Sequence, residues 1–355
     1  MWSSGMRRWA ARPDAAAWLA VAASVPLVVL TLPRLSSGFD YWPALALERH
    51  VPYGSSVLFA YPLPIYLPFA PLGLLPDPLP LLVGPVIAFG FLAAGLWLWG
   101  ARRGVVVAGA LLSPVALGVL VNSNFNAGVA VFGLGLALWA KRNGHYPLVG
   151  LGAALCLWRP ANCLPALAVL LLSGWRRREL LEALAGGTLF MAPLIALAFL
   201  VEPDWLAINR AVLAAYVGWA GLGPHLIQAA GPLGYAAAQV VVAMAGVWVM
   251  RRRSLSDGAA FSYALSVVLA TVGGAYSGAM ALPALVLAAQ DPRYVRLPAF
   301  AGLVGWVIAF ALLAISFPVG VVAYWFVVQA YPLARRRAGA ETPAPGGEAA
   351  APLRV

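Results

Sequence analysis

Long apolar stretches alternate along the chain with short turns that carry glycine, proline or arginine. Stretches of this hydropathy predict helices that cross or enter a membrane. We expect an all-α fold, a polytopic transmembrane helical bundle that forms one domain over residues 1–337. About twelve segments are predicted, at residues 15–33, 79–100, 104–121, 127–140, 146–158, 161–174, 180–201, 233–250, 259–273, 278–290, 298–315 and 319–333.

The two ends of the chain differ from its apolar middle. The first segment follows a basic stretch, as a signal peptide would. Because Leu35-Ser36-Ser37-Gly38 is a poor cleavage site, we expect a retained helix instead. Residues 338–355 are rich in alanine, proline, glycine and glutamate, which predicts a disordered cytoplasmic tail.

The outer loop between the first two segments, residues 34–78, is semi-apolar and dense in proline. It includes Tyr61-Pro62-Leu63-Pro64 and Pro68-Phe69-Ala70-Pro71, in which prolines alternate with aromatic and aliphatic residues. This composition favours re-entrant or interfacial helices on the outer surface over a free loop. We expect this loop and the later outer stretch, residues 202–232, to frame a site.

The segments 146–158 and 161–174 are unusually short. Each has about 13 or 14 residues, too few to cross roughly 30 Å of hydrocarbon at about 1.5 Å per residue. We therefore expect their turn, Trp158-Arg159-Pro160, to lie part-way through the membrane. Short helices at that depth usually line a cavity that is buried in protein or filled with water.

The composition excludes several classes of protein. Hydrophobic residues make up 63% of the 355 residues and charged residues 10%, whereas about a quarter of a typical soluble domain is charged. A soluble chain could not cover its core with so few charges, so a cytosolic enzyme and a secreted disulfide scaffold are excluded. The net charge of +11 raises the question of nucleic-acid binding, which the positions of the charges answer.

Most of the 23 basic residues, which are arginine except for Lys141, lie in tight clusters between the predicted segments. Because positive charge marks cytoplasmic turns, the clusters predict that both termini are cytoplasmic. Nucleic-acid binding is then not needed to explain the positive charge. The charge sets the orientation of the protein in the membrane, and its partner is anionic membrane lipid. The seven clusters are Arg7, Arg8 and Arg12; Arg102 and Arg103; Lys141 and Arg142; Arg176, Arg177 and Arg178; Arg251, Arg252 and Arg253; Arg293 and Arg296; and Arg335, Arg336 and Arg337.

Motifs of familiar soluble enzymes and metal sites are absent from the sequence. His50, His145 and His225 fall in three different loops, so we expect neither a metal nor a cofactor. Cys156 and Cys163 both lie in the short hairpin and are expected to be small core residues.

Two charged residues stand out from the topology. Asp40, in Gly38-Phe39-Asp40-Tyr41-Trp42, follows the first segment and is either a helix-capping interfacial charge or a general base beside an outer cavity. Arg159 lies within the membrane, where an arginine is costly and normally faces the protein interior. It is either a snorkelling or internally paired side chain, or an anion site whose guanidinium binds phosphate or carboxylate.

Other polar side chains on the predicted outer side are candidate ligands of a carbohydrate. Each has a bland alternative, because capping turns and interfacial aromatic belts have the same composition. The candidates are Tyr41, Glu48, His50, Tyr61, Asn124, Asn126, Arg210, His225 and Tyr276.

Residues 38–76 resemble the first outer loop of glycosyltransferase family 87, in the GT-C class of integral membrane glycosyltransferases. That loop has an Asp, one or two Tyr, a stretch like Val51-Pro52-Tyr53-Gly54, and an ending like Tyr61-Pro62-Leu63-Pro64 followed by Pro71-Leu72-Gly73-Leu74-Leu75-Pro76. Residues 122–178 add a second likeness, with Asn124-Phe125-Asn126, Lys141-Arg142, Gly150-Leu151-Gly152, Arg159-Pro160 and Gly174-Trp175-Arg176-Arg177 in the family's order. Arg159 stands where the family usually has Lys.

The resemblance implies an inverting, metal-independent enzyme that moves a sugar, mannose or a pentose, from a polyprenyl-phosphate donor. The acceptor would be a lipid or a cell-envelope glycan at the outer face of the membrane. Carried over by position, Asp40 would be the general base and Arg159 would bind the donor phosphate. The scarcity of lysine and the abundance of alanine, arginine, glycine and proline indicate a GC-rich bacterial genome, hence a bacterial cytoplasmic membrane.

Two alternatives stay open at this point. Twelve segments also suit a secondary transporter, although such a protein should carry coupling carboxylates within its helices, and this sequence has almost none there. The chain could also be a non-catalytic GT-C-like subunit that binds lipid or glycan.

Overall fold

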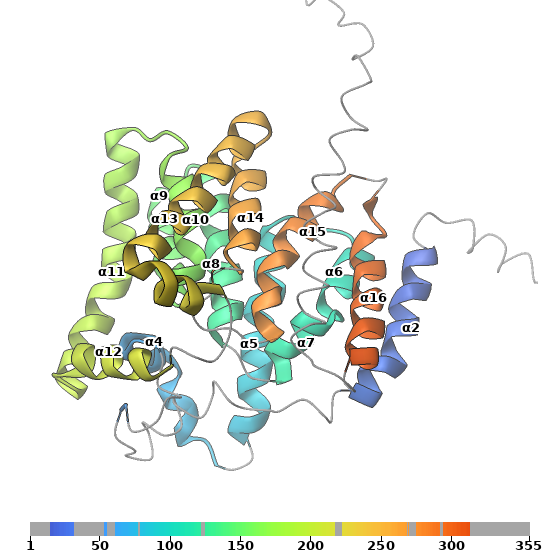
Figure 1. Ribbon diagram of the computed structural model, residues 1–355, viewed down its shortest axis with the longest axis horizontal. Helices are drawn as coiled ribbons and strands as arrows, with labels where there is room; N and C mark the ends of the chain where they lie inside the picture. The colour runs from blue at the N-terminus through green and yellow to red at the C-terminus, as the bar shows by residue number, and fades with distance from the viewer. Residues whose placement is uncertain are drawn as a thin grey trace, which may run out of the picture.

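The computed structural model describes residues 15–31, 53–54, 61–76, 79–121, 125–216, 222–267, 269, 275–291 and 294–312. Within these ranges all regular structure is helical, so the prediction of an all-α fold is confirmed (Figure 1). The elements are α2 (Ala15–Thr31), α4 (Leu63–Tyr66), the 3₁₀ helix η3 (Leu67–Leu74), α5 (Leu79–Leu98), α6 (Gly104–Leu111), α7 (Pro114–Val121), α8 (Phe125–Arg142), α9 (Tyr146–Cys156), α10 (Pro160–Leu171), α11 (Arg177–Val201), α12 (Trp205–Tyr216), α13 (Leu222–Arg252), α14 (Leu255–Ser266), the 3₁₀ helix η4 (Ala275–Ala281), α15 (Leu282–Ala288) and α16 (Leu297–Leu312).

Two of the described helices are long and apolar enough to cross a membrane. They are α11 and the part of α13 from Leu226 to Arg252, and a third span results if α7 and α8, bent by 115°, count as one. The prediction of about twelve spans is not confirmed, because many apolar stretches fold into shorter pieces. The predicted segment 104–121, for example, is divided into α6 and α7 just before Pro114, which has no N–H to continue a helix. The predicted segment 319–333 and the predicted tail 338–355 lie outside the described residues.

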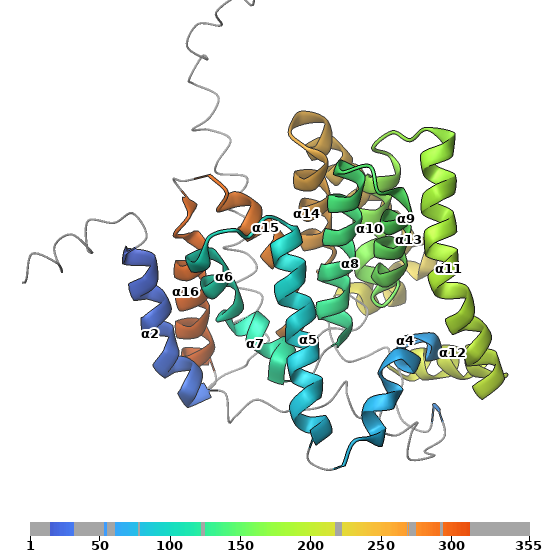
Figure 2. The same ribbon diagram turned by 180° about the vertical axis from the view of Figure 1, so that it is seen from behind.

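The α9–α10 hairpin lies inside the larger helical group. Helix α9 packs against α8 and α11, and α10 packs against α13 and α14. Helix α5 extends this group along α8, and α2 and α16 lie side by side at the far edge (Figures 1 and 2). The largest cluster of buried apolar side chains runs through these helices from α2 to α16.

The basic turns gather at one end of the molecule. The turns after α5, α8, α10 and α13 all lie at the upper end in both views, whereas α4 and α12 lie at the lower end (Figures 1 and 2). Side chains join neighbouring turns: Lys141 donates from Nζ to the Gly174 carbonyl over 2.8 Å, and Arg142 donates to the Leu98 carbonyl over 3.4 Å. The bundle therefore has a basic end and an opposite end, which carries Glu202 and Asp204 beside α12.

The hairpin ends near the middle of the bundle. Helices α9 and α10 have 11 and 12 residues, which corresponds to about 16–18 Å of helix. At their turn, the Trp158 ring lies 5.8 Å from the ring of Phe190, which is close to the midpoint of α11. The side chains of residues 157–159 are therefore placed at mid-height, far from the basic end at which the hairpin begins.

Small residues allow α9 to approach its neighbours closely. A Cβ atom on Gly150 would lie 1.7 Å from the Ala183 carbonyl oxygen of α11, and one on Gly152 would lie 2.5 Å from the Gly133 carbonyl oxygen of α8. Helix packing through small residues is typical of membrane proteins, where van der Waals contact replaces the hydrophobic effect between helices.

Gly150→Ala should force α9 away from α11 and lower the stability of the protein by about 1–3 kcal/mol, the usual cost of overpacking. Thermal unfolding in detergent would show the loss as a lower Tm. Gly90→Ala is the matched control, since a Cβ atom at Gly90 in α5 meets nothing within 4 Å. Equal Tm values for the two variants would contradict the close approach of α9 and α11.

Candidate functional site

Three consecutive side chains at the hairpin turn enter three different environments. Leu157 lines an apolar cavity and is 40% exposed, Trp158 belongs to a buried aromatic cluster, and Arg159 is 3% exposed. The turn is therefore the point at which a lipid-like surface, an aromatic cluster and a buried cation meet.

Local hydrogen bonds fix the backbone of this turn. The Arg159 N–H donates to the Cys156 carbonyl over 3.0 Å, and the Arg159 carbonyl accepts from the N–H groups of Asn162 and Cys163. Pro160 occupies the first position of α10, where its missing N–H costs nothing. The sequence Arg-Pro thus ends one limb and begins the next with the arginine held at the tip.

Polar side chains of α13 and α14 hold the turn against the rest of the bundle. The Asn162 amide donates to the Ser266 carbonyl over 3.2 Å, and the Ser266 hydroxyl donates to the Asn162 carbonyl over 2.5 Å. On the other side, Gln239 donates to the carbonyl of Ala161 over 2.9 Å. Buried polar groups are normally hydrogen-bonded, and this reciprocal pair fixes the start of α10 to the end of α14.

The described side chains next to Arg159 include a buried phenol and two buried thiols. Tyr263, which is fully buried in α14, lies near Arg159 and the two cysteines. Cys156 and Cys163 are buried free thiols, as the sequence predicts.

An aromatic cluster covers the turn on the side away from the basic end. We call Tyr53, Tyr61, Tyr66, Trp158 and Trp205 the aromatic cluster; all five are buried in one apolar group. The Tyr53 hydroxyl donates to the Tyr61 carbonyl over 2.7 Å, and the ring of Tyr66 lies edge-on to those of Tyr53 and Tyr61 at 6.5 and 6.3 Å. The cluster thus joins the first outer loop to the hairpin tip and to α12.

Helix α12 presents one face to this cluster. Trp205 and Asn209 are four residues apart and are buried on the same face of the helix. Arg210, the next residue, points in another direction and is exposed. Asn209 lies beside the Tyr53 hydroxyl, and burial raises the pKa of Tyr53 well above its usual range. Tyr53 therefore remains a neutral hydrogen-bond donor at physiological pH.

Two indole groups in the aromatic cluster have unused donors. In the part of the chain that the structure describes, the Nε1–H groups of Trp158 and Trp205 are buried and meet no hydrogen-bond acceptor. Buried donors without acceptors are unfavourable by about 1–3 kcal/mol each. Both could donate to an oxygen-rich ligand.

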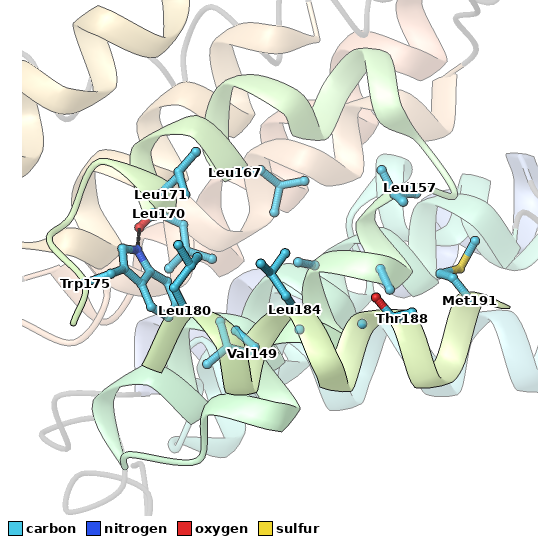
Figure 3. Close-up of a pocket in the computed structure, with 15 residues that line it drawn as sticks. Val149, Leu157, Leu167, Leu170, Leu171, Trp175, Leu180, Leu184, Thr188 and Met191 are labelled. Carbon is cyan, nitrogen blue, oxygen red and sulfur yellow. Dashed lines mark hydrogen bonds between the residues drawn. The ribbon is translucent and has the colours of Figure 1, made fainter. Parts of the chain in front are cut away.

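An apolar groove leads away from the turn toward the basic end. Its volume is about 420 Å³, and it lies between α9, α10 and α11 (Figure 3). Leu157 and Met191 line one end of the groove, and Trp175 and Leu180 line the other. The side chain of Thr188 provides one of the few polar atoms along it. The groove has the length and chemistry to receive a hydrocarbon chain.

The predicted site residues fall into three groups. Tyr61 and Asn126 are buried, Tyr61 in the aromatic cluster and Asn126 in the first turn of α8, whereas Arg210 points to the exterior of α12. His225 and Tyr276 belong to α13 and η4, and their side chains lie outside the described part of the structure. The candidates Asp40, Tyr41, Glu48, His50 and Asn124 lie outside the described residues.

Sequence reasoning missed the polar residues that support the turn. Asn162, Gln239, Tyr263 and Ser266 were not singled out, although each is a polar residue whose neighbours in its helix are mostly apolar. That placement is itself a signal, since polar groups at membrane depth usually face the protein interior.

Comparisons with known proteins do not identify a family for this chain, and the described residues do not form a metal site. Protein-family models, curated proteins and solved structures give no match to this chain. Among the described residues, no three His, Cys, Asp or Glu side chains lie together as a metal site would require.

Ser266→Ala should loosen the hairpin tip, because it removes the hydroxyl that holds the Asn162 carbonyl. Losing about 1 kcal/mol of local stability would raise the reaction rate of the neighbouring thiols with a membrane-permeable maleimide about fivefold. The readout is specific, because the two cysteines of the chain, Cys156 and Cys163, both flank this turn.

Ser262→Ala is the control for this measurement. It removes a comparable bond, from the Ser262 hydroxyl to the Val242 carbonyl at 3.1 Å, that does not involve the turn. A similar rise in thiol reactivity in both variants would mean that Ser266 has no particular role at the tip.

Proposed function

We propose that this chain is an integral membrane glycosyltransferase that moves a sugar from a polyprenyl-phosphate donor to a lipid or cell-envelope glycan. One observation carries the proposal: residues 157–159 bring an apolar groove, an aromatic cluster and a buried guanidinium to a single turn. A polyprenyl-phosphate sugar has the same three parts, a hydrocarbon chain, a sugar and an anion between them.

Arg159 would bind the donor phosphate and stabilise it as it departs. A guanidinium offers several N–H donors in a plane and pairs with phosphate through two parallel hydrogen bonds. In a site of low dielectric such a fixed cation stabilises developing charge more than it would in water. No metal is needed for this role.

The groove between α9, α10 and α11 would hold the first isoprene units. Its walls are mostly leucine, alanine, glycine and valine, and α11 also exposes Leu181 and Leu189 outside the groove. Exposed leucines on a helix of membrane-spanning length are expected to face lipid. A polyprenyl chain could therefore enter sideways from the bilayer.

The aromatic cluster would contact the sugar. Binding sites for small polar ligands combine apolar and aromatic walls with a few fixed polar groups. The two buried indole donors of Trp158 and Trp205 suit sugar hydroxyls or phosphate oxygens. In this scheme Asp40, assigned by the family resemblance, takes the proton of the acceptor hydroxyl as an oxocarbenium-like centre develops.

The orientation follows from the basic end. If positive charge lies inside, the turns after α5, α8, α10 and α13 face the cytoplasm and the aromatic cluster lies toward the outer face. We place the protein in the bacterial cytoplasmic membrane with both termini inside.

Purified protein incubated with polyprenyl-phosphate sugars and an envelope glycan acceptor should release free polyprenyl phosphate. Arg159→Gln should lower kcat/KM about 100- to 1,000-fold, the usual effect of removing an electrostatic stabiliser. Arg159→Lys, which keeps the charge, should retain an intermediate rate. Asp40→Asn should lower kcat about 100- to 10,000-fold, as expected for a general base.

Arg251→Gln controls for the loss of one positive charge, because Arg251 is exposed at the basic end. Full transfer activity in Asp40→Asn or Arg159→Gln would refute the proposed roles. Counterflow of a substrate in proteoliposomes without product formation would identify a transporter. Donor binding with no release in any condition would identify a non-catalytic subunit.

Trp158→Phe separates the donor role of the indole from its packing role. The phenyl ring keeps most of the contact with Phe190 but lacks the N–H, so we expect kcat/KM to fall about tenfold with little change in Tm. Trp99→Phe is the converse control, because the Trp99 indole donates to the Val131 carbonyl over 3.1 Å. It should lower Tm and leave transfer unchanged; the reverse pattern would remove Trp158 from the site.

A further inference from the structure

A second cavity, distinct from the apolar groove, opens at the basic end of the bundle. It has a volume of about 550 Å³, and Arg102, Arg103 and Arg142 line it together with Gln290. These residues come from three parts of the chain: the turn after α5, the end of α8 and the residues after α15. The fold therefore assembles the cavity from segments that are far apart in sequence.

Two of the three arginine side chains, those of Arg102 and Arg142, contact backbone carbonyls and a ring. Arg142 donates from Nε to the Leu138 carbonyl over 3.3 Å and from a terminal nitrogen to the Leu98 carbonyl over 3.4 Å. Arg102 donates to the Trp97 carbonyl, and its guanidinium lies 4.0 Å from the centre of the Trp97 ring.

Gln290 completes the wall of the cavity. Its amide nitrogen donates to the Trp99 carbonyl over 3.0 Å, which joins the segment after α15 to the end of α5. Gly100, with φ of +107°, makes room for it, since a Cβ atom there would lie 2.2 Å from the Gln290 amide nitrogen. The turn after α5 is thus shaped around this contact.

The charge around this cavity is not balanced by the residues that line it. Among the described residues, three arginines line it and no carboxylate does, and Arg102 and Arg142 are close enough to interact electrostatically. By contrast, Arg176 and Arg178, in another turn of the same end, each pair with a glutamate. Like charges held together are unfavourable unless an anion lies between them.

We propose that this cavity binds the phosphodiester headgroup of an anionic membrane phospholipid. Arginine pairs with phosphate through paired hydrogen bonds, and basic pockets between membrane helices recognise such headgroups. The remaining wall includes the apolar residues Leu98, Val106 and Val286. Trp97, 54% exposed beside Arg102, is the kind of residue found at the membrane interface.

This site is separate from the hairpin turn. The cavity lies at the basic end beside α5, α8 and α15, whereas Trp158 packs against Phe190 near the midpoint of α11, within the aromatic cluster. Its ligand is a resident lipid, and the inference holds whether or not the chain transfers sugars.

The experiment compares thermal unfolding of the full-length protein in phosphatidylcholine nanodiscs with and without phosphatidylglycerol. The anionic lipid should raise the Tm of the unsubstituted protein by about 5 °C. The triple variant Arg102→Gln, Arg103→Gln, Arg142→Gln should lose this rise. The matched control, Arg251→Gln, Arg252→Gln, Arg253→Gln, removes the same number of charges from the same end and should keep it.

Equal losses in the two triple variants, or no rise in the unsubstituted protein, would overturn the proposal. Inorganic phosphate in nanodiscs of phosphatidylcholine alone separates the two sources of the anion. A rise with inorganic phosphate that equals the rise with phosphatidylglycerol would overturn the assignment to a lipid. Should the first triple variant not fold, Arg103→Gln alone should still remove about half of the rise; a full rise in that variant would count against the cavity.

Discussion

The arrangement of this bundle depends on the burial of one arginine at the tip of a hairpin that is too short to cross a bilayer. Arg159 is 3% exposed, and the limbs that carry it have 11 and 12 residues. A guanidinium at membrane depth is costly by several kcal/mol unless protein surrounds it. Helices α8, α11, α13 and α14 supply that surrounding, and their contacts with the hairpin form the centre of the fold.

Two kinds of contact hold the hairpin inside the bundle: close helix packing on one side and hydrogen bonds on the other. Glycines at positions 150 and 152 bring α9 against the backbones of α11 and α8. Asn162 and Ser266 exchange hydrogen bonds between α10 and α14. The two kinds of contact leave the outer edge of the hairpin free to form the apolar groove, so the groove and the buried cation are consequences of the same insertion.

Local features of this fold can be predicted from the sequence, whereas features that depend on distant residues cannot. Helices α5, α8 and α11 follow apolar stretches and begin or end within about three residues of the predicted limits. Hydropathy predicts apolar stretches but not the positions at which a helix breaks. The number of spans therefore differs from the prediction, because α6 and α7 are separate and most other helices are short. The bond between Asn162 and Ser266 joins residues 104 positions apart, and Asn209, not its predicted neighbour Arg210, faces Tyr53. Such pairings arise only when the helices pack.

Photocrosslinking would test most directly whether the hairpin turn is a binding site for a lipid-linked phosphate. A polyprenyl phosphate with a photoreactive group in its first isoprene units would be bound to the purified protein, irradiated and mapped by peptide mass spectrometry. We expect labels on the groove residues Leu157, Leu167 and Met191, and a loss of most of this labelling in Arg159→Gln. Labels elsewhere on the bundle, or equal labelling of the groove in that variant, would contradict the assignment of Arg159 to the phosphate.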